Sequence, residues 1–146
     1  MYTVDANIFA RDTDSHDPLY PVCHAFLEAC DHRQIPIIVP NLILAEVAAT
    51  VSRMRRDPIR ARLSAASIAA FEHIQLVSLD DRLAEEAVEL AADRALRGAD
   101  AVYVAVARRY RCALVTLDRE QRERAALVVR TLTPTEVLAE LDPDAA

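Results

Sequence analysis

Short apolar runs alternate with amphipathic stretches along the whole chain. The apolar runs are rich in β-branched residues and predict strands at 2–5, 35–39, 74–78 and 112–117, with a weaker candidate at 127–130. The stretches between them carry apolar residues at helical spacing and predict helices at 19–32, 41–55, 58–72, 81–95, 99–109 and 134–141. Residues suited to capping precede several of these helices, namely Asn41, Asp80 or Asp81, and Thr133.

The alternation of strands and helices predicts an α/β fold. A three-layer α/β/α sandwich with a mainly parallel central sheet is the architecture that this order favours. The predicted strands are apolar throughout, as expected for strands that are covered on both faces. We assign residues 1–141 to a single domain and residues 142–146 to a short C-terminal tail.

The composition is that of a soluble globular protein. The chain has 146 residues, of which 53% are hydrophobic and 27% are charged. The N-terminus lacks a basic region followed by an apolar one, and the longest apolar stretch, 35–51, is interrupted by prolines and Glu46. The three cysteines, Cys23, Cys30 and Cys112, have no disulfide-framework spacing. We therefore expect a cytoplasmic protein that does not cross a membrane.

Two residue types exclude much common chemistry. The chain contains no lysine, which excludes Walker-type phosphate loops, Schiff-base enzymes and the lysine-dependent site of receiver domains. Its single glycine, Gly98, excludes a dinucleotide-binding loop. The net charge of −6 is unusual for a protein that binds nucleic acid, but acids gathered around a cation would account for part of it.

The arginines gather in three clusters, at 53–56, 108–111 and 119–124. These clusters could bind phosphate groups. The simpler interpretation, which we favour, is that they are solvated helix faces or helix C-termini, where cations are favoured.

Two of the candidate site residues follow predicted strands. Asp5 ends the first strand and Asp118 comes just after the fourth. Ligands of open α/β sheets bind at the carboxyl ends of the strands, so both acids can face one crevice. Each acid alone could instead be a helix N-cap.

Two further acids lie on predicted helices. The neighbours of Glu46 at helical spacing are Leu42, Ile43, Ala49 and Thr50, so its carboxylate is partly desolvated. This desolvation costs free energy unless a cation or a hydrogen-bond donor compensates. An ion pair with a buried arginine is the alternative explanation. Asp100 opens an apolar helix, where the helix dipole is by itself a sufficient reason for an acid.

The four acids together predict a metal site. Carboxylates that share a crevice repel one another and raise each other's pKa unless a divalent cation is present. An oxygen-rich set of ligands suits Mg²⁺ or Mn²⁺. A cation held there can activate water and stabilise the charge that develops when a phosphodiester is hydrolysed, which is nuclease chemistry.

Four segments carrying these acids resemble the motifs of the PIN domain family, and more narrowly of the VapC toxins of bacterial and archaeal toxin–antitoxin pairs. The segments are Val4-Asp5-Ala6-Asn7, residues 40–47, residues 99–105 and Leu114-Val115-Thr116-Leu117-Asp118. Each segment is weakly specific, but their order and spacing extend the resemblance over nearly the whole chain. One departure is Gln121, where relatives often have an aromatic or aliphatic residue.

The resemblance implies roles for individual residues. Asp5, Glu46, Asp100 and Asp118 would be the ligands of Mg²⁺ or Mn²⁺, directly or through water. Asn7 and Thr116 would be supporting polar groups. The resemblance further implies cleavage of RNA, a homodimer, and inhibition by a small cognate antitoxin whose tail occupies the active-site groove. Arg11 could contact an RNA phosphate, although a surface role is the alternative.

Other interpretations of the same residues remain open. Cys23, His24, Cys30 and His32 could be proposed as a zinc site, but the spacing favours core cysteines. A phosphatase with Asp5 as nucleophile lacks the second aspartate and the lysine that such enzymes use. A PIN-like scaffold that binds RNA or protein without cutting, and an RNA-processing nuclease that is no toxin, are the remaining alternatives. For the dimer, the amphipathic segments 42–56 and 59–71 are the candidate surface.

Overall fold

The computed structural model describes residues 1–142, so the predicted tail lies outside the described residues from position 143 onward. The strands of the described part are β1 (Tyr2–Val4), β2 (Ile37–Pro40), β3 (Ile74–Val77), β4 (Ala113–Val115) and β5 (Thr131–Leu132). Its helices are α1 (Ala6–Arg11), α2 (Tyr20–His32), α3 (Leu42–Arg55), α4 (Pro58–Ala70), α5 (Asp81–Arg94), α6 (Gly98–Tyr110), α7 (Arg119–Ala125) and α8 (Pro134–Leu141).

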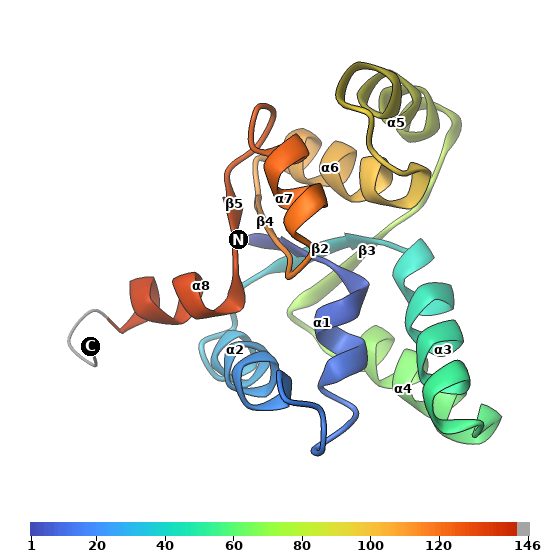
Figure 1. The fold of residues 1–146 in the computed structure, drawn as a ribbon, viewed down its shortest axis with the longest axis vertical. Helices are drawn as coiled ribbons and strands as arrows, with labels where there is room; N and C mark the ends of the chain where they lie inside the picture. Colours follow the sequence, from blue (N-terminus) through green and yellow to red (C-terminus); the bar gives the residue numbers. More distant parts are fainter. Residues whose placement is uncertain (143–146) are drawn as a thin grey trace.

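The five strands form one parallel sheet in the order β3-β2-β1-β4-β5. Helices α5 and α6 lie on one side of the sheet, and α1, α2 and α4 lie on the other (Figure 1). The predicted α/β/α sandwich with a parallel sheet is therefore confirmed. Within residues 1–142, none of the helices combines the length and apolar character that crossing a membrane requires.

Helix α6 is the central helix of its layer. Its residues 101–107 are all buried, and it contacts β1, β2 and β4. A helix that is apolar on every side is stable only when it is covered all round, which explains its position against the middle of the sheet. This packing holds the first turn of α6, with Asp100, beside the carboxyl ends of the central strands.

The structure corrects three details of the predicted elements. Helices α1 and α7 were not predicted, because with six and seven residues they are too short to show a helical period. The weak strand at 127–130 is wrong, since these residues form a turn and Leu127 is 74% exposed. The strand is instead β5, which pairs with Leu114 and Val115 of β4.

The predicted helix caps are confirmed at two positions. The Asp80 carboxylate accepts a hydrogen bond from the backbone N–H of Leu83, and Thr133 forms a capping box with Glu136. Asn41 precedes α3, but its side chain makes no capping hydrogen bond.

Candidate active site

The four predicted acids line one cleft of about 350 Å³. It lies at the carboxyl ends of β1 and β4. From β1 the chain continues to β2 and β3 on one side of the sheet, and β4 and β5 lie on the other side, so β1 and β4 flank the switch point. Such switch points are where open α/β sheets bind ligands, because the connections leave the two strands in opposite directions and open a crevice. The backbone N–H of Asp5 donates to the carbonyl oxygen of Val115 at 3.0 Å, which holds Asp5 beside the end of β4.

Asp5 is the most deeply buried of the four acids, with 7% of the residue exposed. Its Oδ2 accepts hydrogen bonds from the Thr116 hydroxyl at 3.3 Å and from Asn7 Nδ2 at 3.4 Å. Burial, followed by the charges of Asp100 and Glu46, raises the pKa of Asp5 to about 6. Thr116 and Asn7 therefore lie where they can orient the Asp5 carboxylate. A nearby positive charge would further stabilise its ionised form.

Glu46 is half-buried on α3, and its carboxylate contacts the hydroxyl of a tyrosine on α6. The Tyr103 hydroxyl donates to Glu46 Oε2 at 2.6 Å, and Tyr103 is 1% exposed. Burial raises the pKa of Glu46, and the hydrogen bond from Tyr103 opposes that shift. Among the described residues the partner of Glu46 is thus a tyrosine, and not the arginine that we considered as an alternative. The position of Tyr103, three residues after Asp100 on one helix, is a sequence signal that we did not use.

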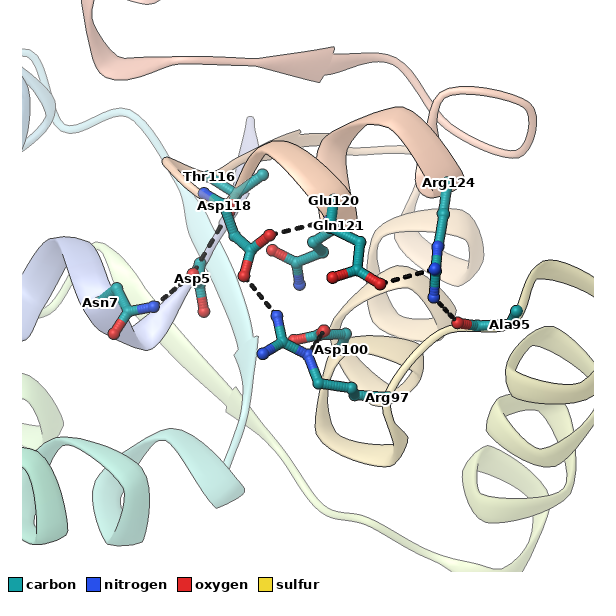
Figure 2. Close-up of polar contacts among 10 residues, drawn as sticks. All are labelled: Asp5, Asn7, Ala95, Arg97, Asp100, Thr116, Asp118, Glu120, Gln121 and Arg124. Atoms are coloured by element: carbon teal, nitrogen blue, oxygen red, sulfur yellow. Dashed lines mark hydrogen bonds and ion pairs between the residues drawn. The ribbon is translucent and has the colours of Figure 1, made fainter.

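Asp100 and Asp118 share one arginine, Arg97, at the other side of the cleft (Figure 2). Arg97 Nε donates to Asp100 Oδ2 at 2.8 Å, and Nη2 donates to Asp118 Oδ2. Asp118 is also the N-cap of α7, because its Oδ1 accepts a hydrogen bond from the backbone N–H of Gln121 at 3.0 Å. The structural role that we considered for Asp118 is therefore real, and it leaves Oδ2 facing the cleft.

The pKa values of Asp100 and Asp118 are shifted in opposite directions. The hydrogen bond from the Gln121 N–H, together with Arg97, lowers the pKa of Asp118. Burial raises the pKa of Asp100, and the contact with Arg97 opposes that shift without reversing it. Negative charge is thus better compensated at the end of β4 than in the first turn of α6.

The sequence matches the model of the PIN domain over residues 2–127. The chain belongs to the PIN domain family. A search of curated proteins gives no significant match.

Solved structures resemble this PIN domain over most of their length. VapC20 from Mycobacterium tuberculosis, a sarcin–ricin loop cleaving toxin, has a TM-score of 0.71 at 19% identity and covers 83% of this chain and 92% of its own. PAE2754 from Pyrobaculum aerophilum has a TM-score of 0.70 at 19% identity, with 98% and 96% covered. A toxin–antitoxin complex from Klebsiella pneumoniae has a TM-score of 0.65 at 20% identity, with 92% and 98% covered. At these identities the likeness shows a shared fold.

The donors in the cleft of this PIN domain suit a hard divalent cation. Four carboxylates, with a hydroxyl and an amide behind Asp5, form an oxygen-rich set, and the raised pKa of Asp5 indicates negative charge that lacks compensation. As the side chains stand, no three His, Cys, Asp or Glu residues between positions 1 and 142 are close enough to hold one metal ion together. The chemistry of the donors therefore fits Mg²⁺ or Mn²⁺, and binding requires some side chains to turn.

Arg11 is the arginine that we considered for an RNA contact, with a surface role as the alternative. Arg11 ends α1 and donates to both carboxylate oxygens of Asp17, at 2.9 and 2.8 Å, and it is not among the residues that line the cleft. The arginines that do line it are Arg53 and Arg97. The RNA contact of Arg11 stays a prediction, and the positive charges inside the cleft are those of Arg53 and Arg97.

Gln121 occupies the position where the sequence departs from the motif. The residue is 1% exposed, and neither atom of its side-chain amide has a hydrogen-bond partner within the described part of the chain. A buried amide without partners costs stability. Gln121 is thus a buried polar side chain in the first turn of α7, and it does not line the cleft.

Proposed function

We propose that this PIN domain is an endoribonuclease that depends on Mg²⁺ or Mn²⁺, and that it acts in the cytoplasm as the toxin of a toxin–antitoxin pair. The convergence of four acids from four separate segments on one cleft is the observation that carries the proposal. Burying Asp5 raises its pKa and costs stability, and its side chain makes no capping hydrogen bond at the start of α1 that would offset this cost. A cost of this kind is expected at a functional site.

The residues of the cleft divide into ligands and supports. A divalent cation bound by Asp5, Glu46, Asp100 and Asp118 would supply an activated water and compensate the charge on the phosphate. Thr116 and Asn7 hold Oδ2 of Asp5 in place, and Tyr103 does the same for Oε2 of Glu46. Fixed supports of this kind matter because loss of a ligand's hydrogen-bond partner typically costs tenfold or more in affinity or activity.

Metal dependence is tested with purified protein and RNA substrates, both single-stranded and structured. We expect cleavage with Mg²⁺ or Mn²⁺, loss of cleavage to the level of a no-protein control in EDTA, and recovery when Mn²⁺ is added in excess. Equal cleavage with and without EDTA would contradict the metal mechanism. Binding of RNA without any cleavage would instead identify the protein as a scaffold.

The toxin role is inferred from the VapC-like motifs and from the fold. An antitoxin would inhibit by placing its tail in the acidic cleft, where a basic side chain could contact Asp5 or Glu46. The neighbouring reading frame is an inexpensive test: a short upstream gene that encodes a DNA-binding head and an arginine-bearing tail supports the toxin role, and a solitary gene favours general RNA processing. Cys23, Cys30 and Cys112 are free thiols, in agreement with the proposed cytoplasmic location.

A homodimer is part of the proposal, with α3 and α4 as its surface. Ile59 and Leu63 lie one turn apart on α4 and are 64% and 65% exposed, and Met54 near the end of α3 is 46% exposed. Large apolar side chains that are exposed on two neighbouring helices support an interaction surface there.

Replacing Leu63 with aspartate is expected to convert the dimer into a monomer, because the new charge would be buried against the partner. Light scattering coupled to size-exclusion chromatography measures the mass. Val88→Asp is the matched control, since Val88 is 69% exposed on α5, away from the proposed surface. A wild-type protein that is monomeric at micromolar concentration would contradict the proposed dimer.

A further inference from the structure

Arg97 contacts two of the proposed metal ligands at their carboxylate oxygens. Its guanidinium donates to Oδ2 of Asp100 at 2.8 Å and to Oδ2 of Asp118, and Figure 2 shows it lying between these two side chains. Asp100 and Asp118 are only 16% and 25% exposed at their side chains. One positive charge thus compensates half of the acids in the cleft.

The backbone of Arg97 is fixed, whereas its side chain can move. The preceding residue, Leu96, is buried, and the residue that follows Arg97 begins α6. Arg124 of α7 donates to the carbonyl oxygen of Ala95, which ties this turn to α7 (Figure 2). The Arg97 side chain, however, is 62% exposed, so it can leave its partners without disturbing the core.

A guanidinium and a divalent cation compete for the same carboxylate oxygens, so each weakens the binding of the other. The present arrangement leaves no three candidate ligands within residues 1–142 close enough for one metal ion, so a cation must change it. On these observations, and given the proposed function, we propose that Arg97 is an intramolecular competitor of the catalytic cation. It holds Asp100 and Asp118 while the cleft is free of metal and releases at least one of them when a cation binds.

This competition has two opposite effects. Without a cation, Arg97 reduces the repulsion among the acids and stabilises the fold. During metal binding, its ion pairs must be broken, which weakens the apparent affinity for the cation. Arg97 therefore sets how much free cation the protein needs.

Arg53 supplies a matched comparison. It lines the same cleft and carries the same charge, but its hydrogen bond goes to Thr50 Oγ1, at 3.4 Å, and among the described residues it makes no ion pair with the four acids. Removing Arg53 measures the general effect of losing a positive charge near the cation. Removing Arg97 adds the specific effect of freeing the two carboxylates.

The test measures the affinity of the whole chain for Mn²⁺ by electron paramagnetic resonance or by calorimetry. We expect Arg97→Gln to bind Mn²⁺ roughly five- to tenfold more tightly than wild type, and Arg53→Gln to differ by less than about twofold. In EDTA, Arg97→Gln should melt at a lower temperature than wild type, and Mn²⁺ should raise its Tm by more. Arg97→Lys keeps the charge but loses the planar guanidinium, so its affinity for Mn²⁺ should lie between those of wild type and Arg97→Gln. It also provides the test if Arg97→Gln fails to fold.

The outcomes separate this proposal from the nuclease assignment. Unchanged or weaker Mn²⁺ binding in Arg97→Gln, or equal tightening in Arg97→Gln and Arg53→Gln, would overturn the competition. Tighter binding in Arg97→Gln together with no RNA cleavage by any variant would overturn the nuclease and leave the competition standing. Failure of every protein to bind Mn²⁺ would overturn both.

Discussion

Asp5→Asn is expected to abolish RNA cleavage and, at the same time, to stabilise the metal-free protein. The stabilisation follows from the pKa of Asp5, which is raised to about 6 by burial and by the charges of Asp100 and Glu46. A carboxyl group with a raised pKa contributes its full stability only below its unfolded pKa, and that contribution is lost as the pH rises through the folded value. For Asp5 the loss occurs between about pH 4 and pH 6.5, because the ordinary pKa is 3.8 and the folded one is about 6.

The expected gain therefore depends on pH. Asparagine cannot ionise, and its carbonyl oxygen can still accept the hydrogen bonds from Thr116 and Asn7. In EDTA, Asp5→Asn should exceed the wild-type free energy of unfolding by about 3 kcal/mol at pH 7.5 and by only about 1 kcal/mol at pH 4.5. Urea denaturation at both pH values measures the difference. An asparagine variant that is less stable than wild type at pH 7.5 would contradict the account of Asp5.

Asp118→Asn is the matched control in the same cleft. The Gln121 N–H and Arg97 lower the pKa of Asp118, so its charged form stabilises the folded state and its replacement should destabilise the protein at pH 7.5. Both variants should nevertheless lose cleavage by about 100-fold or more in saturating Mn²⁺, because each removes a proposed ligand. Opposite effects on stability with a shared effect on cleavage would separate ligand loss from misfolding.

Tyr103→Phe is expected to impair both stability and cleavage without touching an acid. The substitution removes the hydroxyl that donates to Glu46 at 2.6 Å and leaves a half-buried carboxylate without its donor. Loss of a hydrogen bond to a charged, partly buried group costs about 1–3 kcal/mol, and we expect a decrease of that size in the free energy of unfolding at pH 7.5. Cleavage should decrease about tenfold, because Glu46 is then less well positioned for a cation.

The pH dependence of this loss also has a definite sign. Burial already raises the pKa of Glu46, and the donor from Tyr103 opposes that shift, so its removal raises the pKa further. The cost is present while Glu46 is ionised and disappears as the pH falls below its pKa. Tyr110→Phe on the same helix is the control, since the Tyr110 hydroxyl has no hydrogen-bond partner among the described residues. Equal effects of Tyr103→Phe and Tyr110→Phe would rule out the specific role of Tyr103.

The sequence alone was sufficient to predict an α/β/α sandwich with a parallel sheet and the placement of Asp5 and Asp118 at strand ends. Buried parallel strands are continuous apolar runs, and the helices between them are long enough to show their period, so both are local features of the chain. Asp5 and Asp118 directly follow such runs. Since all parallel strands point the same way, their ends, and the residues that follow them, meet at one edge of the sheet.

Short elements were beyond the reach of the sequence pattern. Helices α1 and α7 each contain fewer than two full turns, and β5 has two residues. Their conformation depends on what they contact: β5 exists because Leu132 pairs with Val115 and is buried, whereas most of the more β-rich run at 127–130 forms a turn and only the carbonyl of Arg130 bonds to β4. Tertiary pairing therefore overrode local propensity.

Only the tertiary structure decided which side chains act on the acids. Tyr103 and Glu46 are 57 residues apart in the chain, and Arg97 and Asp118 are 21 apart, so no spacing rule links them. The sequence has seventeen arginines, and nothing in its linear order places Arg53 and Arg97 in the cleft while pairing Arg11 with Asp17. Asp5 and Asp118 follow from local pattern because strand ends position them. Glu46 and Asp100 lie on helices, and they meet Tyr103 and Arg97 at the cleft only through the packing of α3 and α6.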